Sequence, residues 1–283
     1  MTLAPDCGLL AEYSWDHTVA SPARIRDAAL GGKDNYSAER LALRELEDAA
    51  PGFTDLLRTV RAWHVRVVRL LAARGFDQFL DCAAGLPTAR ENTHQTAQRQ
   101  NREAKVVYTD TDRLVVTYGR ALLDDNDNTD VVHADHLDPH RLLTHEAVRS
   151  ALDLSRPVAL LMTAGVHHEP HDEHLATALA GYRELLPPGS ALALSCWSHP
   201  DTPGGHRALA RKIEHTWESL CHRPIRVRTD TDVRRFFTGL DLLEPGVARL
   251  DEWWPDGPVL RKPLPAQHLA FGGVGVKRGQ DLR

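Results

Sequence analysis

An alternation of short apolar runs with longer amphipathic stretches, which begins after Gly75, constrains the fold of this sequence most strongly. The first two apolar runs, at 78–81 and 105–110, each end in an aspartate. Such an alternation of strands and helices builds a parallel sheet with helices on both faces and right-handed crossovers. We therefore expect a doubly wound α/β fold. Further strands are predicted at 130–134, 157–163 and 190–196, and helices at about 88–102, 112–123, 139–151 and 172–186.

Residues 22–73 are predicted to be helical. The Gly31-Gly32 pair interrupts the pattern, because glycine has high backbone freedom. The clearest helix is expected behind Thr54 as its N-cap, and Gly75 supplies its C-terminal stop. Its apolar residues recur at helical spacing and must pack on another part of the protein: Leu56, Leu57, Val60, Trp63, Val67, Val68 and Leu71.

These patterns divide the sequence into three parts: an N-terminal tail at 1–21, a helical cap or lid at 22–74 and a Rossmann-like domain at 75–283. We expect the cap to cover the ligand site and not to form an independent domain. The last part of the chain is predicted to contain, in order, a helix near 205–221, a strand near 225–227, a helix near 233–237 and a terminal β-hairpin formed by 242–250 and 268–276.

The composition is typical of a globular protein with a sizeable core, since 42% of the 283 residues are apolar and 26% are charged. The apolar residues never run unbroken for the roughly 18 to 20 positions of a membrane helix, and acidic residues near the N-terminus argue against a secretory signal. With a net charge of −5, the chain lacks the clustered basic face that nucleic acid requires. We expect a cytoplasmic protein with a small-molecule substrate and no membrane or nucleic-acid partner. The sequence leaves its oligomeric state open, a homodimer included.

No metal site is predicted. The four cysteines are isolated from one another and form no CxxC pair, which argues against structural zinc and against a disulfide framework. The acidic run at 124–130 lacks the glycine and the closing glutamate of an EF-hand loop. The histidines that begin at His167 do not have the spacing of an HExxH zinc site, and they favour a solvated helix start.

Aspartates stand at the ends of the first three predicted strands, at Asp81, Asp110 and Asp135. Ligands of doubly wound sheets bind beyond the carboxyl ends of the strands, so these side chains are expected to face one crevice. Three carboxylates disfavour a diphosphate, and the G-x-G-x-x-G turn of dinucleotide sites is absent. They suit a nucleoside with a cationic extension, such as S-adenosylmethionine. The alternative for each aspartate is a helix N-cap.

Seven stretches, spread over most of the chain, match the pattern of a known family: PARIRDAALGGKDN, FLDCAAGLPT, VVYTDTD, VVHADHLDP, PVALLMTAGVHH, LPPGSALALS and FFTGLDLLEPGV. In these stretches the chain resembles the actinobacterial S-adenosylmethionine-dependent methyltransferase-like family, which was once described only as a domain of unknown function. The resemblance implies a class I methyltransferase sheet of seven strands with the last one antiparallel, and a helical N-terminal cap.

The resemblance also implies S-adenosylmethionine as the cofactor and assigns roles to residues of this chain. The residues carried over to cofactor binding are Lys33, Asp34 and Asn35 in the N-terminal signature, Asp81, Ala83 and Gly85 in the cofactor-binding turn, Asp110 as the acceptor of the ribose hydroxyls, and Asp135 beside the adenine. The N-terminal signature is expected to lie above the cofactor.

Two departures from the family pattern bear on function. Ala83 stands where the turn D-x-G-x-G has its first glycine; an alanine at positive φ costs on the order of 1 kcal/mol, and its methyl group takes ligand space. Arg26 and Ala28 stand where the family has aromatic side chains, so a more open space is expected around the sulfonium. The favoured function is methyl transfer to a small molecule. The alternatives are a cyclase or lyase that closes the aminobutyryl chain of S-adenosylmethionine and releases methylthioadenosine, and a non-catalytic partner subunit.

His167 and His168 follow the fourth predicted strand, on the substrate side of such a fold. An imidazole there can accept a proton near neutral pH, and both methyl transfer and cyclisation give a base a task. We predict that His168, and with less weight His167, is the catalytic base. The alternative is a packed histidine bonded to the backbone.

Overall fold

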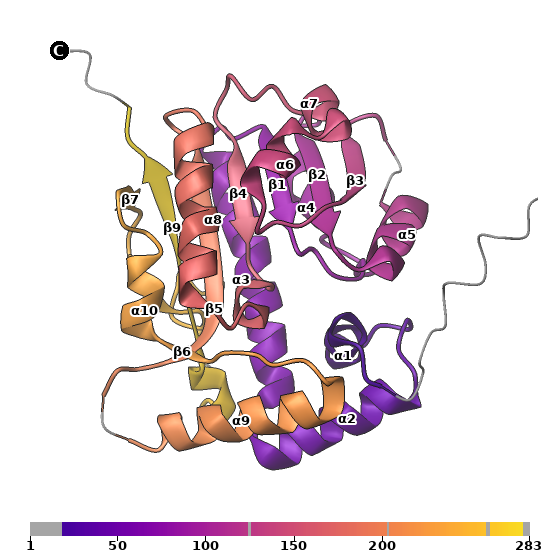
Figure 1. Cartoon of the computed structure of the whole chain (residues 1–283), viewed down its shortest axis with the longest axis vertical. Helices are drawn as coiled ribbons and strands as arrows, with labels where there is room; N and C mark the ends of the chain where they lie inside the picture. Colours follow the sequence, from indigo (N-terminus) through magenta and orange to yellow (C-terminus); the bar gives the residue numbers. More distant parts are fainter. Residues whose placement is uncertain (1–18, 124–125, 203, 259–260, 280–283) are drawn as a thin grey trace, which may run out of the picture.

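A central sheet organises the fold, and its strands lie in the order β3-β2-β1-β4-β5-β9-β7 (Figure 1). The computed structural model describes residues 19–123, 126–202, 204–258 and 261–279. Two short strands within these residues extend the sheet, since β6 pairs with β5 and β8 pairs with β9. The strands are β1 (Gln78–Cys82), β2 (Lys105–Asp110), β3 (Thr129–His133), β4 (Ala159–Met162), β5 (Ala191–His199), β6 (Arg228–Thr229), β7 (Leu240–Leu242), β8 (Ala248–Arg249) and β9 (Ala270–Lys277).

The direction and the order of the strands confirm the predicted doubly wound α/β fold. Strand β1 pairs in parallel with both β2 and β4, β2 pairs in parallel with β3, and β4 with β5. Strand β9 is antiparallel to β5, β7 and β8. The chain therefore builds one half of the sheet outward from β1 and then returns to place β4 on its other side. Ligands of such sheets bind at this switch point.

Helices cover both faces of the sheet (Figure 1). Successive strand residues point to opposite faces, so Phe79 packs in the cluster that contains α3 and α9, whereas Leu80 packs with α6 and α8. The helices are α1 (Pro22–Ala29), α2 (Ser37–Ala49), α3 (Phe53–Ala73), α4 (Thr93–Gln98), α5 (Arg113–Leu122), α6 (Pro139–Thr144), α7 (Glu146–Ala151), α8 (Asp172–Leu185), α9 (His206–Cys221) and α10 (Asp230–Arg235).

The N-terminal helices lie where the sequence places them. The predicted interruption at Gly31-Gly32 is confirmed, and Gly31 has a φ of +76°. Of the predicted tail at 1–21, only 19–21 fall within the described residues. No helix in the described part of the chain is both long enough and apolar enough to cross a membrane. The role of 22–74 as a lid stays a prediction.

The start of α3 is capped by a different residue from the predicted one. Gly52, with a φ of +92°, occupies the N-cap position, and the helix begins at Phe53. The carboxylate of Glu47 accepts hydrogen bonds from the N–H groups of Gly52 (2.6 Å) and Thr54 (2.8 Å). Glu47 therefore satisfies N–H groups that the helix itself leaves free. The prediction of Thr54 as the N-cap is wrong.

Several other elements differ from their predicted bounds. The helix expected at 88–102 is limited to α4, and the one expected at 139–151 is divided into α6 and α7 at His145, whose backbone is extended. The strand expected at 225–227 is wrong, because the pairing with β5 begins only at Arg228. At the end of the chain, β7 and β8 are two separate short strands, and both pair with β9.

A buried ion pair joins α1 to α2. Arg24 Nε donates to Glu39 Oε1 at 2.9 Å, and both side chains are buried. The Glu39 carboxylate also accepts the N–H groups of Ser21 (3.1 Å) and Tyr36 (2.9 Å). Burial raises the pKa of Glu39, but these hydrogen bonds together outweigh burial, so that the pKa is lowered. The ionised carboxylate therefore stabilises the folded state.

Glu39→Gln is expected to lower the free energy of unfolding by about 3 to 5 kcal/mol, because it leaves the charge of Arg24 buried without its partner. The folded-state pKa of Glu39 lies below the usual glutamate value of 4.5. The wild-type contribution is therefore complete above a pH of about 4.5 and is lost as the pH falls through the folded-state pKa. Urea unfolding at pH 7 and at lower pH measures both effects. The control is Glu45→Gln on the exposed face of α2, and an equal loss in the two variants would contradict the assignment.

Candidate cofactor and active site

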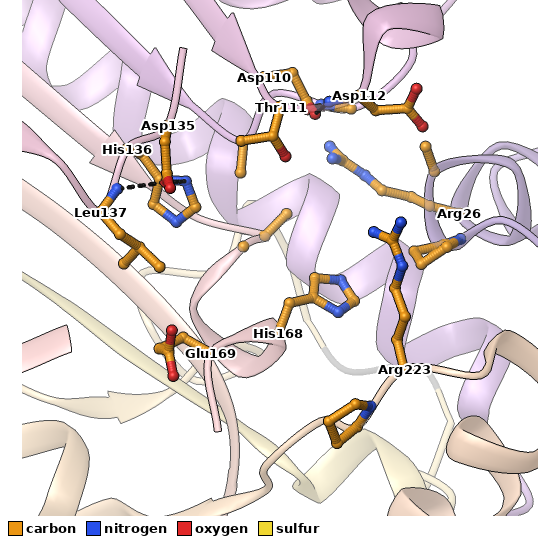
Figure 2. A pocket seen from close by; sticks show the side chains of 17 residues that line it. Arg26, Asp110, Thr111, Asp112, Asp135, His136, Leu137, His168, Glu169 and Arg223 are labelled. Atoms are coloured by element: carbon orange, nitrogen blue, oxygen red, sulfur yellow. Dashed lines mark hydrogen bonds and ion pairs between the residues drawn. The ribbon is translucent and has the colours of Figure 1, made fainter. Parts of the chain in front are cut away.

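A pocket of about 300 Å³ lies beyond the carboxyl ends of the parallel strands, at the switch point of the sheet (Figure 2). The loops after β1, β2, β3 and β4 form most of its wall, and α1 and the segment after α9 complete it. The residues that line it include Arg26, Ala83, Gly85, Asp110, Asp112, Asp135, His136, Gly165, His168, Glu169 and Arg223.

Asp110, at the end of β2, holds the turn after β1. Its Oδ2 accepts the N–H group of Gly85 at 3.0 Å, and its Oδ1 accepts that of Asp112 at 2.9 Å. Burial raises the pKa of Asp110, and these two backbone hydrogen bonds act against that rise. Gly85 has a φ of +71°, and a Cβ atom there would lie 2.8 Å from Nη1 of Arg26. The turn therefore requires glycine at this position.

Ala83 keeps the left-handed backbone that a glycine would adopt, with a φ of +53°. Its methyl group packs against Gly165 in the loop after β4, where a Cβ atom would lie only 2.5 Å away. The missing side chain of Gly165 therefore makes room for Ala83. Both residues line the pocket, so the methyl group of Ala83 forms part of its wall.

Arg26 reaches into the pocket from α1 (Figure 2). Its Nη1 donates to the carbonyl oxygen of Ala84 at 3.0 Å. Burial, together with the charge of Arg61, lowers the pKa of Arg26 to about 10, against the opposing effect of Asp81 and Asp110. The expectation that position 26 opens the pocket is wrong, because the long arginine side chain takes up that space. Ala28 is not among the lining residues.

Asp135, in the loop after β3, lines the same pocket as Asp110. Its side chain is about half exposed, and its Oδ1 accepts the N–H group of Leu137 at 2.8 Å. Oδ1 therefore holds the turn after β3, and the exposed carboxylate is accessible from the pocket.

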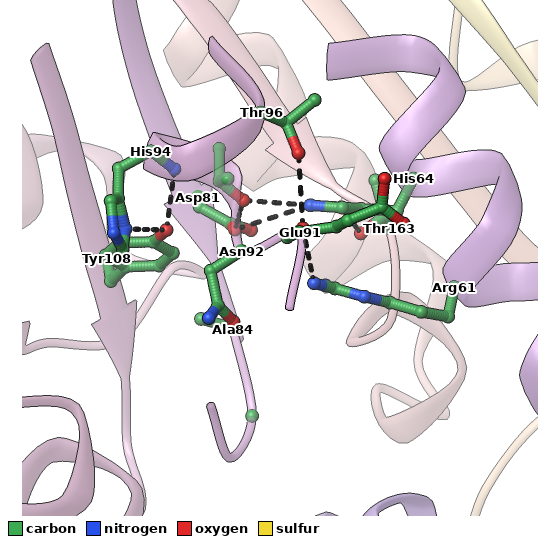
Figure 3. Close-up of polar contacts among 12 residues, drawn as sticks. Arg61, His64, Asp81, Ala84, Glu91, Asn92, His94, Thr96, Tyr108 and Thr163 are labelled. Carbon is green, nitrogen blue, oxygen red and sulfur yellow. Dashed lines mark hydrogen bonds and ion pairs between the residues drawn. The ribbon is translucent and has the colours of Figure 1, made fainter. Parts of the chain in front are cut away.

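Asp81 lies beneath the pocket and does not line it. Its Oδ2 accepts a hydrogen bond of 2.6 Å from the hydroxyl of Thr93 on α4 (Figure 3). His64 on α3 contacts the same hydroxyl through Nε2 at 2.8 Å, and its Nδ1 lies 2.8 Å from Oγ1 of Thr163. Because the Thr93 hydroxyl gives its proton to Asp81, it must accept from Nε2, and Nδ1 then accepts from Thr163.

This His64–Thr93–Asp81 chain consists of buried groups. Burial lowers the pKa of His64 well below its usual value, so the ring is neutral. Burial also raises the pKa of Asp81 to about 6, against the opposing effects of Thr93, Arg61 and Arg26. His64 and Thr93 were not predicted as site residues from the sequence. A signal existed for His64, because it is a polar residue within the apolar stripe of α3.

The two histidines after β4 have different surroundings. His168 lines the pocket, and burial, His136 and Arg223 lower its pKa to about 4. His167 is buried away from the pocket and stacks on Trp197 with a ring distance of 3.9 Å. The geometry thus brings His168, and not His167, to the same space as Asp110 and Asp135.

The N-terminal signature residues Lys33, Asp34 and Asn35 do not line the pocket. They close the loop after α1, where Oδ2 of Asp27 accepts the N–H group of Asp34 (2.9 Å) and the side-chain amide of Asn35 (2.8 Å). A Cβ atom at Gly32 would collide with the same Asp27 carboxylate at 1.8 Å. The GGKDN stretch therefore fixes the end of α1, which carries Arg26.

The histidines that follow His167 do not form a metal site. Across the described ranges there is no group of three His, Cys, Asp or Glu side chains arranged to hold a metal ion. Nδ1 of His174 instead contacts Glu169 Oε2 at 2.9 Å. Residues 124–125 of the acidic run lie outside the described residues.

The family of S-adenosyl methyltransferases matches this chain over residues 10–278. The chain belongs to this family. A candidate methyltransferase from Thermobifida fusca YX is 36% identical, with a TM-score of 0.84 over 93% of this chain and 97% of that one. A DUF574 family protein from Streptomyces avermitilis is 35% identical, with a TM-score of 0.83 over 93% and 99% of the two chains. No curated protein matches.

More distant structures share the fold of this S-adenosyl methyltransferase. Human N-acetylserotonin methyltransferase in complex with S-adenosylmethionine has a TM-score of 0.50 at 12% identity, over 89% of this chain and 71% of that one. The predicted family, the class I Rossmann-like fold and the transferase activity are thereby confirmed, and S-adenosylmethionine is the cofactor.

The pocket of this methyltransferase fits such a cofactor. The left-handed turn at Gly85 brings its backbone to the pocket wall without a side chain, and close approach of a ligand to backbone needs such a glycine. An ionised carboxylate has about four acceptor sites, so Asp110 retains acceptor capacity beyond its two backbone hydrogen bonds. A volume of about 300 Å³ is within the range of small-molecule sites.

Thr93→Val is expected to lower the free energy of unfolding by about 1 to 3 kcal/mol, because Asp81 and His64 lose their shared hydroxyl in a buried setting while the side-chain shape is kept. Thermal or urea unfolding measures the loss. Thr117→Val is the matched control, since this exposed hydroxyl on α5 bonds only the backbone oxygen of Arg113 among the described contacts. If the two variants lose the same stability, the buried chain has no special role.

Proposed function

We propose that this S-adenosyl methyltransferase methylates an oxygen or nitrogen atom of a small molecule bound beside His168. The observation that carries the proposal is the position of His168 in the same pocket as Asp110 and Asp135 (Figure 2). Asp110 and Asp135 are suited to bind a nucleoside, and His168 supplies a general base in the same space. The enclosing side chains of α1 favour a small acceptor over a macromolecular one.

The cofactor supplies an electrophilic methyl group on a sulfonium. Asp110 would accept the ribose hydroxyls, Asp135 would lie beside the adenine, and the backbone at Ala83 and Gly85 would approach the methionine end. Asp81 would act through the turn that follows it. Lys33, Asp34 and Asn35 would act indirectly, because their loop positions α1 over the pocket as part of the lid at 22–74.

His168 would take the proton that the acceptor atom loses. With a pKa lowered to about 4, its ring is unprotonated at neutral pH and can accept a proton, although it is a weak base. His167 has no place in this scheme, because its ring is buried against Trp197. The cyclase and partner-subunit alternatives were motivated by Ala83. The left-handed backbone at Ala83 and the room beside Gly165 favour an intact cofactor turn and methyl transfer.

Asp110→Asn is expected to weaken binding of S-adenosylmethionine by roughly 10- to 100-fold, because an amide is a poorer partner for two hydroxyls than a carboxylate. Calorimetry on the full chain measures the affinity, and thermal unfolding shows whether the variant is folded. Asp48→Asn, on the exposed side of α2, is the control. Unchanged affinity in a folded Asp110→Asn variant would remove Asp110 from the cofactor site.

His168→Asn is expected to lower turnover by about 100-fold or more while cofactor affinity and thermal midpoint are retained. The wild-type kcat/KM, which reports the free enzyme, should stay level from neutral pH down to about pH 5 and fall only as His168 is protonated, near pH 4. Rates over this pH range, once an acceptor is found, measure both effects. If the rate instead falls near pH 6.5, and does so in His168→Asn as well, the base is another residue.

A further inference from the structure

An arginine without a partner lines the pocket next to the predicted base. Helix α9 ends at Cys221, and His222 takes a left-handed conformation with a φ of +51°. The chain then turns, and Arg223 extends into the pocket (Figure 2). In the described part of the chain, no hydrogen bond or ion pair holds its guanidinium group.

The neighbouring arginines of the same segment are held by the protein itself. Arg226 donates to the carbonyl oxygen of Pro170 and pairs with Asp172 at 2.8 Å. Arg228 is fully buried and bonds Asp172 and the carbonyl oxygens of Val166 and Glu169. Arg223 is the exception among the three: it is exposed, and its donors remain available at the wall of the pocket.

Arg26 adds a second cation to the same cavity. A guanidinium group has five N–H donors, and the described contacts of Arg26 use one of them, toward Ala84. The pocket carboxylates are already engaged with backbone N–H groups: Asp110 with Gly85 and Asp112, Asp112 with Leu114, and Asp135 with Leu137. Among the described lining residues, the cationic groups with N–H donors still available are the guanidinium groups of Arg26 and Arg223.

We propose that Arg223, together with Arg26, binds a carboxylate or phosphate group of the acceptor and so holds the acceptor beside His168. Planar guanidinium groups match carboxylate and phosphate oxygens in charge and in geometry. The inference rests on the proposed function and specifies its substrate class: a small anionic molecule that carries a nucleophilic oxygen or nitrogen.

Binding of an anion there would also affect the base. The groups that face His168 are His136, Arg223 and the neighbouring His167, with Glu169 next to it in the chain and Trp217 against its ring. The positive charge of Arg223 is one cause of the low pKa of His168. An anion on Arg223 offsets that charge and raises the pKa of His168. The base would therefore become stronger when the acceptor is in place.

The cofactor has a carboxylate of its own, which is the other source of an anion in this pocket. The acceptor and the cofactor can be told apart by which ligand preference depends on Arg223. If Arg223 binds the acceptor, its loss affects the choice between charged and neutral acceptor probes. If it binds the cofactor, its loss affects the choice between S-adenosylhomocysteine and methylthioadenosine, which lacks the carboxylate.

The first test compares benzoate with the neutral benzamide by calorimetry on the full chain, saturated with S-adenosylhomocysteine. We expect benzoate to bind the wild type about 10- to 100-fold more tightly than benzamide, as charge-assisted hydrogen bonds would give. Arg223→Gln should remove most of this preference, and Arg223→Lys should retain part of it. Arg211→Gln, on the exposed side of α9, is the matched control and should retain all of it.

Two results of this test would overturn the proposal: equal affinity of the wild type for the two probes, or an undiminished preference in Arg223→Gln. A second arm measures S-adenosylhomocysteine and methylthioadenosine without any probe. A preference for S-adenosylhomocysteine that is unchanged in Arg223→Gln supports the acceptor as the source, and a preference that disappears overturns it. If S-adenosylhomocysteine does not bind the wild type at all, the proposed function fails. The benzoate comparison on the unliganded chain still decides whether Arg223 binds anions.

Discussion

The short hydrogen bond between Thr93 and Asp81 is the contact on which the architecture of the site depends. It links α4 to the end of β1, and His64 extends the link to α3 and, through Thr163, to the end of β4. Buried polar groups are costly when they lack partners, so this chain admits one arrangement of protons and one arrangement of elements. The turn in which we propose that the cofactor binds follows Asp81 directly, so this chain of hydrogen bonds fixes its position from below.

Above this layer, the pocket separates its charges. The carboxylates lie at the ends of β2 and β3, Arg223 comes from the segment after α9, and Arg26 reaches from α1 to the carbonyl oxygen of Ala84 in the turn after β1. A cationic cofactor would then bind against the carboxylates, and an anionic acceptor would bind against Arg223 and the remaining donors of Arg26. The same separation would limit the wrong binding mode, because like charges in a partly buried pocket repel strongly.

The elements that could be predicted are those defined by local patterns. Asp110 and Asp135 follow apolar strands, and parallel strands place their carboxyl ends at one edge, so the sequence was sufficient to bring them together. The partners of His64 lie 29 and 99 residues away, and no local pattern pairs them. The sequence shows Arg26 as a departure from the family pattern. The direction of its side chain depends on the orientation of α1, which the loop at Gly32 fixes. The chain turns toward the pocket at His222, which adopts a left-handed conformation, and Arg223 follows it. A histidine in the sequence does not predict such a conformation.

The contact between Ala83 and Gly165 has a consequence for the evolution of this pocket. The methyl group of Ala83 occupies the volume that a side chain at position 165 would need. The space between the two loops therefore holds one methyl group but not two. Substitutions at such a pair are not additive, and an exchange of alanine and glycine between them costs less than a second methyl group added to either. A relative with glycine at position 83 would thus have room for a Cβ atom at 165. The methyl group of the pocket wall could then be supplied by the loop after β4 instead of the loop after β1, and the turn after β1 would keep its conformation.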